Sequence, residues 1–135
     1  MSVAILLITH ASLGSELLRI ASGIFGTCPA RAEALDVEND TPCDPLLDQA
    51  ERHAARLDEG DGVLVLTDLY GSTPANLALG LRERCDRVRV LAGVNLPMLV
   101  RALSYNALDL DQVAEKALDG GRDGVLSCDK RTGET

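Results

Sequence analysis

Residues 3–9, with the sequence VAILLIT, and residues 62–67, with the sequence GVLVLT, decide the fold class of this chain. Both segments are short and almost continuously apolar. A strand that is apolar on both faces is typical of a parallel sheet covered by helices on each side, whereas a half-exposed strand alternates between apolar and polar residues. We therefore predict that these two segments are central strands of a parallel sheet.

Two further strands and the helices between them complete an alternating pattern. Residues 87–92 form the fourth predicted strand, and residues 32–37 alternate in polarity as an edge strand does. A last short strand is predicted over residues 123–128. Helix boundaries are predicted from capping residues, proline at the first helical position and glycine after the last one. The predicted helix starts are Ser12, Asp44 before Pro45, Thr73 before Pro74, and Asn95, and the predicted stops are Gly26 with Pro29 and Gly120 with Gly121.

The alternation of strands and helices predicts an α/β fold with a doubly wound, flavodoxin-like, mainly parallel sheet and helices on both faces. In its strand order, 2-1-3-4, the chain reverses direction between strands 1 and 3, and ligands bind beyond the carboxyl ends of those strands. His10 follows the first strand and Asp68 follows the third. The fold therefore predicts that these two side chains meet.

The residues expected at this edge suit phosphate chemistry. His10 offers a nucleophilic nitrogen, and Asp68 offers a carboxylate that can hydrogen-bond one ring nitrogen and fix the tautomer. Gly71, Ser72 and Thr73 form a turn that leads into a helix, whose N-terminus presents N–H groups and the positive end of its dipole. Together they predict transient phosphorylation of His10.

Each of these residues also has a structural interpretation. A histidine or an aspartate after a strand is often a cap or a turn residue, and Thr73 before Pro74 is explained as a helix start. Their coincidence at the predicted switch point favours function. His53, on the apolar face of a predicted helix, is interpreted as structural or solvated. No P-loop or acidic pair for magnesium is present, so a donor that carries an activated phosphoryl group, such as a phosphohistidine, is expected.

Composition excludes several classes of protein. The 135 residues suit one domain, and a formal net charge of −8 argues against nucleic acid, whose phosphates are held by clustered Lys and Arg. No signal peptide or membrane-spanning segment is recognisable, so a cytoplasmic protein is expected, without membrane insertion. The four cysteines show no metal-ligand spacing, and neither a metal nor another cofactor is predicted. They are Cys28, Cys43, Cys85 and Cys128.

Four blocks, in this order, resemble the enzyme IIA component of the mannose-type phosphotransferase system: residues 4–26, 62–76, 91–103 and 120–127. The resemblance implies that His10 receives a phosphoryl group from the phosphocarrier protein HPr and passes it to an enzyme IIB partner. It also implies that Asp68 orients the histidine and that Thr73 donates a hydroxyl to the phosphate. Family members form homodimers that exchange a C-terminal strand, which here would be residues 123–128.

The resemblance leaves some functions open. Where the family often has a pair of glycines in the turn, this chain has Gly71 and Ser72, which offers a further hydroxyl. Residues 1–129 are expected to form a single phosphocarrier domain and residues 130–135 a short frayed tail, with no linker or IIB domain following. The chain could accordingly regulate rather than import a sugar. Alternatives are the phosphoryl-donor subunit of dihydroxyacetone kinase and a docking module switched by phosphorylation.

Overall fold

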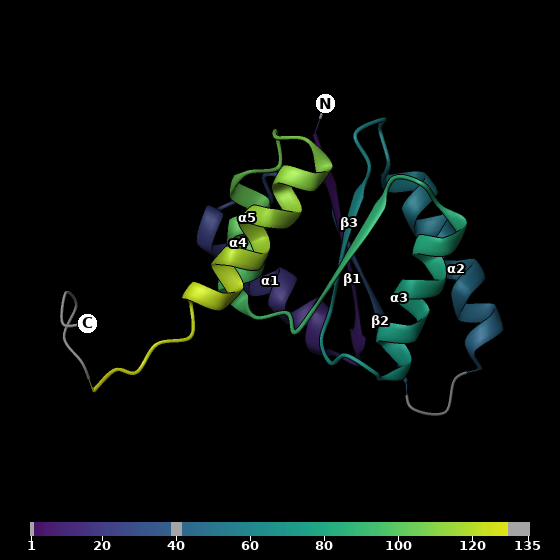
Figure 1. Ribbon diagram of the computed structural model, residues 1–135, viewed down its shortest axis with the longest axis horizontal. Helices are drawn as coiled ribbons and strands as arrows, with labels where there is room; N and C mark the ends of the chain where they lie inside the picture. The colour runs from purple at the N-terminus through teal and green to yellow at the C-terminus, as the bar shows by residue number, and fades with distance from the viewer. Residues whose placement is uncertain (1, 39–41, 130–135) are drawn as a thin grey trace.

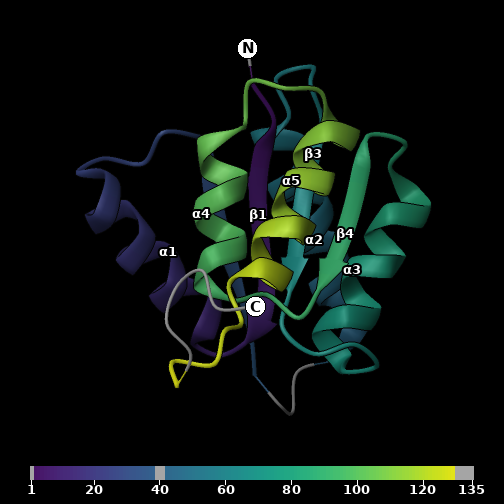
Figure 2. The same cartoon turned by 60° about the vertical axis from the view of Figure 1, so that its left-hand side comes forward.

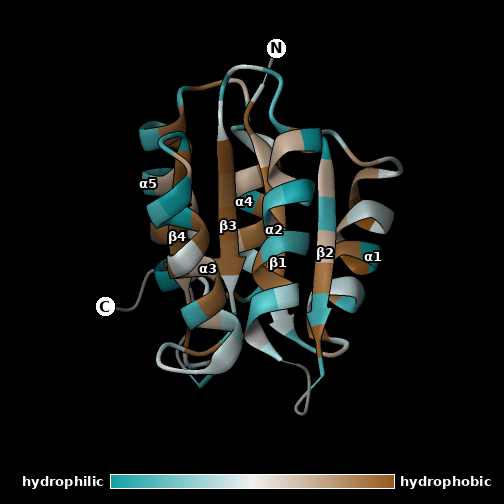
Figure 3. Cartoon of the chain, turned by 90° about the vertical axis from the view of Figure 1, so that its right-hand side faces the viewer, coloured by the Kyte–Doolittle hydropathy of each residue, from teal (hydrophilic) through white to brown (hydrophobic). Residues whose placement is uncertain are grey.

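Four parallel strands form one sheet in the order β2-β1-β3-β4, as the sequence predicted. The computed structural model describes residues 2–38 and 42–129. The strands are β1 (Ala4–His10), β2 (Ala32–Val37), β3 (Val63–Thr67) and β4 (Val88–Ala92). The two apolar segments that decided the fold class are the central strands β1 and β3, and β2 is an edge strand. Figure 3 shows their apolar residues in brown along the middle of the sheet.

Helices cover both faces of this sheet. They are α1 (Leu13–Phe25), α2 (Cys43–Leu57), α3 (Thr73–Arg84), α4 (Leu96–Ser104) and α5 (Leu110–Asp123). In Figure 1, α2 and α3 lie on one side of the strands, and α1, α4 and α5 lie on the other. Alternate residues of β1 supply the two cores: Leu6 and Ile8 pack towards α2 and α3, while Ile5 and Leu7 pack towards α1, α4 and α5. None of the described helices is long and apolar enough to cross a membrane.

Because the strands are parallel, their carboxyl ends share one edge of the sheet. Ile8 of β1 lies beside Thr67 of β3, so the next residues of these two strands leave the sheet together. Helices α1, α3 and α4 begin at this edge, and α5 ends there (Figure 2). The edge therefore collects helix N-termini and strand-end side chains, which is the arrangement that the flavodoxin-like order requires.

Several predicted helix boundaries were wrong by a residue or more. Helix α2 begins at Cys43, after Pro42, rather than at the Asp44–Pro45 pair, and Ser72 rather than Thr73 is the cap of α3. The predicted stop at Gly120 and Gly121 is wrong as well, because α5 continues to Asp123.

These two glycines allow α5 to approach α4 closely. A Cβ atom on Gly121 would lie 2.8 Å from Met98 Cε, and one on Gly120 would lie 2.7 Å from Arg101 Cβ. Close packing, rather than helix termination, explains both glycines.

The predicted C-terminal strand is not a strand within this chain. Asp123 is the last residue of α5, and residues 125–127 are irregular and pair with no strand among the described residues. Figure 1 shows this segment leading away from the rest of the molecule. A strand needs a neighbour for its backbone hydrogen bonds, and the described residues of one chain offer none here. The predicted frayed tail, residues 130–135, lies outside the described residues.

Candidate functional site

His10 and Asp68 meet at the carboxyl edge of the sheet, as their positions after β1 and β3 predicted. His10 is the last residue of β1 itself. Its ring nitrogen Nδ1 lies 2.8 Å from Asp68 Oδ2, and its backbone N–H donates to the same oxygen over 3.1 Å. The other oxygen, Oδ1, accepts a hydrogen bond of 3.0 Å from the N–H of Leu69. One carboxylate therefore holds both the ring and the backbone of the histidine.

The ionisation of Asp68 fixes the tautomer of the histidine. Burial alone would raise the pKa of this carboxyl, but hydrogen bonds from the His10 ring and backbone N–H bring that pKa below its ordinary value of 3.8. The carboxylate is thus ionised at neutral pH and can only accept hydrogen bonds. In the neutral imidazole Nδ1 then carries the ring proton, and Nε2 has the free lone pair. The His10 side chain is 41% exposed, so this nitrogen is accessible.

The turn after Asp68 leads into α3 through Gly71 and Ser72. Gly71 has a φ of +86°, in the left-handed region that favours glycine. The hydroxyl of Ser72 donates to the carbonyl of Leu69 over 2.6 Å, and it accepts a long bond of 3.4 Å from the N–H of Ala75. That Ser72 adds a hydroxyl for a phosphate stays a prediction, and within the described chain this hydroxyl serves the turn and the helix cap.

Thr73 is better placed to donate. It is the exposed first residue of α3, and its side chain makes no hydrogen bond within the described part of the chain. Pro74 has no N–H, and the N–H groups of Ala75 and Asn76 bind to Ser72. In the first turn, the N–H and the hydroxyl of Thr73 are the donors that remain for an anion at the helix N-terminus.

Three large apolar side chains that are close in sequence to His10 or Asp68 are exposed. Leu69 is 63% and Tyr70 is 79% exposed in the turn after Asp68, and Leu13 is 43% exposed at the start of α1. We call these three residues the apolar collar. The chain carries few aromatic residues, and exposed apolar groups that form one patch are typical of a protein-docking surface.

Sequence reasoning missed one residue of this site, Thr9. It is fully buried, and its hydroxyl donates to the His10 carbonyl over 2.9 Å and accepts from the N–H of Gly14 over 2.7 Å. Ser12, which was predicted to cap α1, makes no side-chain capping bond. No local pattern reveals this role of Thr9, because it depends on how α1 folds back against the strand.

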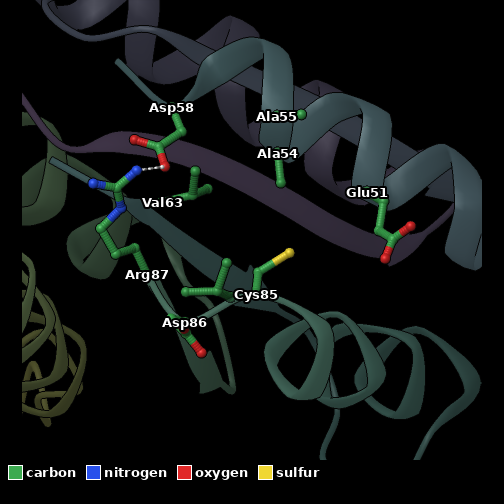
Figure 4. Close-up of a pocket in the computed structure, with 9 residues that line it drawn as sticks. Glu51, Ala54, Ala55, Asp58, Val63, Cys85, Asp86 and Arg87 are labelled. Atoms are coloured by element: carbon green, nitrogen blue, oxygen red, sulfur yellow. Dashed lines mark ion pairs between the residues drawn. The ribbon is translucent and has the colours of Figure 1, made fainter. Parts of the chain in front are cut away.

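The other features of the chain lie apart from His10. His53 is half-buried on α2, with Nδ1 2.5 Å from Glu33 Oε1, as the structural interpretation predicted. A cavity of about 650 Å³ lies at the opposite edge of the sheet, where β3 and β4 begin (Figure 4). In it the carboxylate of Asp58 pairs with Arg87 over 3.2 Å. Among the described residues, no three His, Cys, Asp or Glu side chains are grouped as a metal ion would need.

Residues 4–118 match the family model described as the PTS system fructose IIA component. The chain is also 32% identical over 127 residues to the PTS system mannose-specific EIIAB component of Escherichia coli K12. This chain belongs to the mannose-type IIA family. The alignment covers 93% of this chain but only 39% of that relative. A shorter match, 41% identical over 58 residues, covers 42% of this chain and 40% of the fructose-specific EIIA component of Bacillus subtilis strain 168.

Solved structures of IIA proteins share the fold. The mannose/sorbose-specific IIA subunit from Enterococcus faecalis superposes with a TM-score of 0.86 at 24% identity, covering 97% of this chain and 98% of that one. The IIA protein associated with the fucose utilization operon of Streptococcus pneumoniae gives a TM-score of 0.79 at 24% identity, over 96% and 97% of the two chains. The IIA family model spans His10, Asp68 and Thr73.

Proposed function

We propose that this IIA chain is a phosphocarrier of a sugar phosphotransferase system that carries a phosphoryl group on Nε2 of His10. The observation that carries the proposal is the 2.8 Å contact between His10 Nδ1 and the ionised Asp68. This contact favours the tautomer that has its proton on Nδ1 and leaves Nε2 as the nucleophile. Transfer between two histidines needs positioning and charge support rather than nucleotide chemistry.

The transfer step is a displacement at phosphorus. The lone pair of Nε2 attacks the phosphorus of a phosphohistidine on the donor, the donor's P–N bond breaks, and its electrons return to the donor imidazole. The His10 ring becomes positively charged during the attack, since Nδ1 keeps its proton. Asp68 stabilises that charge at hydrogen-bonding distance, in the same way that a buried carboxylate supports an imidazolium in other triads. Transfer onward is the reverse reaction with the acceptor.

The negatively charged oxygens of the transferred phosphoryl group also need hydrogen-bond donors. The N-terminus of α3 begins two residues after Gly71, and the Thr73 N–H and hydroxyl are unused within the described residues. We propose that Gly71 gives the backbone its close approach, that Ser72 holds the turn, and that Thr73 binds the phosphoryl oxygens. The helix dipole adds a favourable field for the anion at this position.

The donor and the acceptor are proposed to be proteins. The apolar collar of Leu13, Leu69 and Tyr70 is close in sequence to His10 or Asp68 and suits a protein surface better than a sugar. As the family implies, the donor would be HPr and the acceptor a IIB component, with the reaction in the cytoplasm and residues 1–129 acting as one phosphocarrier unit. The net charge of −8 argues against nucleic acid as a partner.

A homodimer is proposed on the same family basis. Val125 and Leu126 are 75% and 78% exposed in a segment that makes no strand within its own chain. Two adjacent apolar side chains on an exposed, unpaired segment of the described chain favour pairing with the sheet of a second copy. Sedimentation of the full chain and of a Val125→Asp, Leu126→Asp variant tests this. A dimer that the variant disrupts supports the pairing, and a monomeric wild type rejects it.

The function is tested by intact mass measured at basic pH after incubation with phosphoenolpyruvate, enzyme I and HPr. Wild type should gain one phosphoryl group of 80 Da, and His10→Gln should gain none. His53→Gln is the matched control, because the chain has two histidines and His53 lies on α2 beside Glu33. A phosphoramidate on His10 should survive base and hydrolyse in acid. An acid-stable product, or one formed in His10→Gln, would contradict the proposal.

The acceptor is tested with the phosphorylated chain. Incubation with a IIB protein should discharge His10, and the loss of mass measures the rate. Discharge by the dihydroxyacetone-binding subunit of dihydroxyacetone kinase, with none by IIB, would assign the chain to that kinase instead. A chain that takes phosphate and changes its protein partners, but discharges to neither acceptor, would be a docking module switched by phosphorylation.

A further inference from the structure

We propose that Thr9 is a positioning residue for phosphoryl transfer: its hydroxyl fixes the backbone of His10 so that Nε2 faces the donor. This inference deepens the proposed function and rests on it. Thr9 does not touch the phosphoryl group, because its side chain lies on the α1 side of the sheet. It acts instead on the peptide that follows the histidine.

The hydroxyl of Thr9 makes two hydrogen bonds, one as donor and one as acceptor. It donates its single proton to the His10 carbonyl over 2.9 Å, and it accepts the N–H of Gly14 over 2.7 Å. Gly14 is the second residue of α1, so its N–H is one of the donors that a helix leaves unpaired at its start. Thr9 thus connects the end of β1 to the first turn of the helix that follows it.

This connection replaces the usual helix cap. The residue in the capping position, Ser12, makes no side-chain capping bond, so α1 depends on a hydroxyl from the strand. The helix also lies close to that strand, because a Cβ atom on Gly14 would be only 3.0 Å from Thr9 Oγ1 and 3.1 Å from Leu7 Cβ. The Thr9 hydroxyl caps α1 from the preceding strand, and Gly14 lets the helix lie close to it. The loop between β1 and α1 therefore has little freedom to move.

As a consequence, the backbone N–H and the carbonyl of His10 are both hydrogen-bonded, as is Nδ1 of its ring. Asp68 Oδ2 binds its N–H and its Nδ1, Thr9 binds its carbonyl, and the next N–H, that of Ala11, binds to the carbonyl of Val37 over 3.0 Å. The backbone of His10 is therefore fixed before and after the Cα atom, and the contact with Asp68 sets the ring angles. Only Nε2 is left free, which is the preorganisation that group transfer requires.

The test compares hydroxyl-free variants with one that keeps the hydroxyl. Thr9→Val preserves the shape and removes both hydrogen bonds, and Thr9→Ser keeps the hydroxyl. Thr67→Val is the matched control: Thr67 ends the adjacent strand β3 and is also fully buried, but its hydroxyl has no hydrogen-bond partner in the part of the chain that the structure describes. Thr9→Ala serves as a second hydroxyl-free variant if Thr9→Val does not fold.

The first readout is the rate of phosphoryl gain from phospho-HPr, at saturating and at limiting donor. Misplacement of a reacting group by about 1 Å can cost roughly 100-fold in rate, so Thr9→Val should lose about 10- to 100-fold at saturating donor with little change in KM. The rate of Thr9→Ser should stay within about threefold of the wild-type rate, and the rate of Thr67→Val should equal the wild-type rate. A Thr9→Val rate within twofold of wild type, or a Thr9→Ser rate as low as that of Thr9→Val, overturns the proposal.

The second readout does not depend on phosphorylation. The ¹⁵N shifts of the His10 ring report its tautomer, and wild type should show the proton on Nδ1. In Thr9→Val the His10 backbone should shift and lengthen the contact between Nδ1 and Asp68, so the ring should become a mixture of tautomers, while Thr67→Val keeps the wild-type spectrum. Unchanged ring shifts in Thr9→Val reject the positioning role, even if the rate falls. If wild type gains no phosphate at all, the proposed function fails, and the ring shifts still decide whether Thr9 orients His10.

Discussion

Two glycines of the same helix provide a sharp test of how closely α1 lies against β1. Gly14 is in the first turn of α1, where a Cβ atom would lie 3.0 Å from Thr9 Oγ1 and 3.1 Å from Leu7 Cβ. Gly23 is near the other end of this helix, is exposed, and has no atom within 4 Å of the place that a Cβ would take. Changing each to alanine adds the same methyl group in opposite surroundings.

The two substitutions should change the free energy of unfolding in opposite directions. Alanine is favoured over glycine in a helix by about 0.8–1.0 kcal/mol, and less near an end, so Gly23→Ala should stabilise by about 0.5 kcal/mol. At Gly14 the same gain is opposed by overpacking, which costs about 1–3 kcal/mol. Neither neighbour moves easily, since Leu7 Cβ belongs to a buried strand and Thr9 Oγ1 holds two hydrogen bonds. Gly14→Ala should therefore destabilise by about 1–2 kcal/mol.

Urea unfolding followed by far-UV circular dichroism measures both values. The chain contains no tryptophan and two tyrosines, so circular dichroism is a better probe than intrinsic fluorescence. Each kcal/mol should also shift the thermal midpoint by roughly 4 °C. If Gly14→Ala proved as stable as Gly23→Ala, α1 would be able to move away from β1, and the close approach that holds Thr9 in place would be refuted.

Three further predictions follow from the described side chains. Thr67→Val should raise the free energy of unfolding by about 1 kcal/mol, because it removes a buried hydroxyl that lacks a partner among the described residues. A lower free energy of unfolding, measured with urea, would mean that the hydroxyl has a hydrogen-bond partner. The folded-state pKa of Asp68 is lowered, so its contribution to stability is complete above about pH 4 and is lost as the pH falls further. In urea unfolding, Asp68→Asn should therefore be less stable than wild type at pH 7, and the difference in the free energy of unfolding should shrink towards pH 2. A difference that stays constant with pH would contradict this linkage. Tyr70→Ser should raise the KM for phospho-HPr several-fold and leave the rate at saturating donor unchanged, since Tyr70 is 79% exposed; steady-state transfer rates decide, and an unchanged KM would remove Tyr70 from the docking surface.

Much of the site could be predicted from local patterns in the sequence. The continuous apolar runs of β1 and β3 indicate buried parallel strands, because hydrophobic burial acts on every residue of such a run. The topology then brings His10 and Asp68 together, and their hydrogen bond follows from two strand ends that lie side by side. These features depend on the periodicity and order of the chain, which the sequence states directly.

Other features depend on contacts between distant elements. The glycines at positions 120 and 121 read as a helix stop, but α5 continues through them, because the proximity of α4 leaves no room for a side chain there. Likewise the sequence did not show that the hydroxyl of Ser72 donates to the carbonyl of Leu69. Local propensity is a weak signal, and tertiary packing overrides it at such places.

The sequence therefore indicated the class of fold, the strand order and the meeting of His10 with Asp68. Only the tertiary structure decided how those residues are held. Thr9 shows the reason: its hydroxyl binds one group beside it in the strand and another in the first turn of α1. A hydrogen bond depends on distance and direction in space, and these exist only after the helix has packed against the sheet.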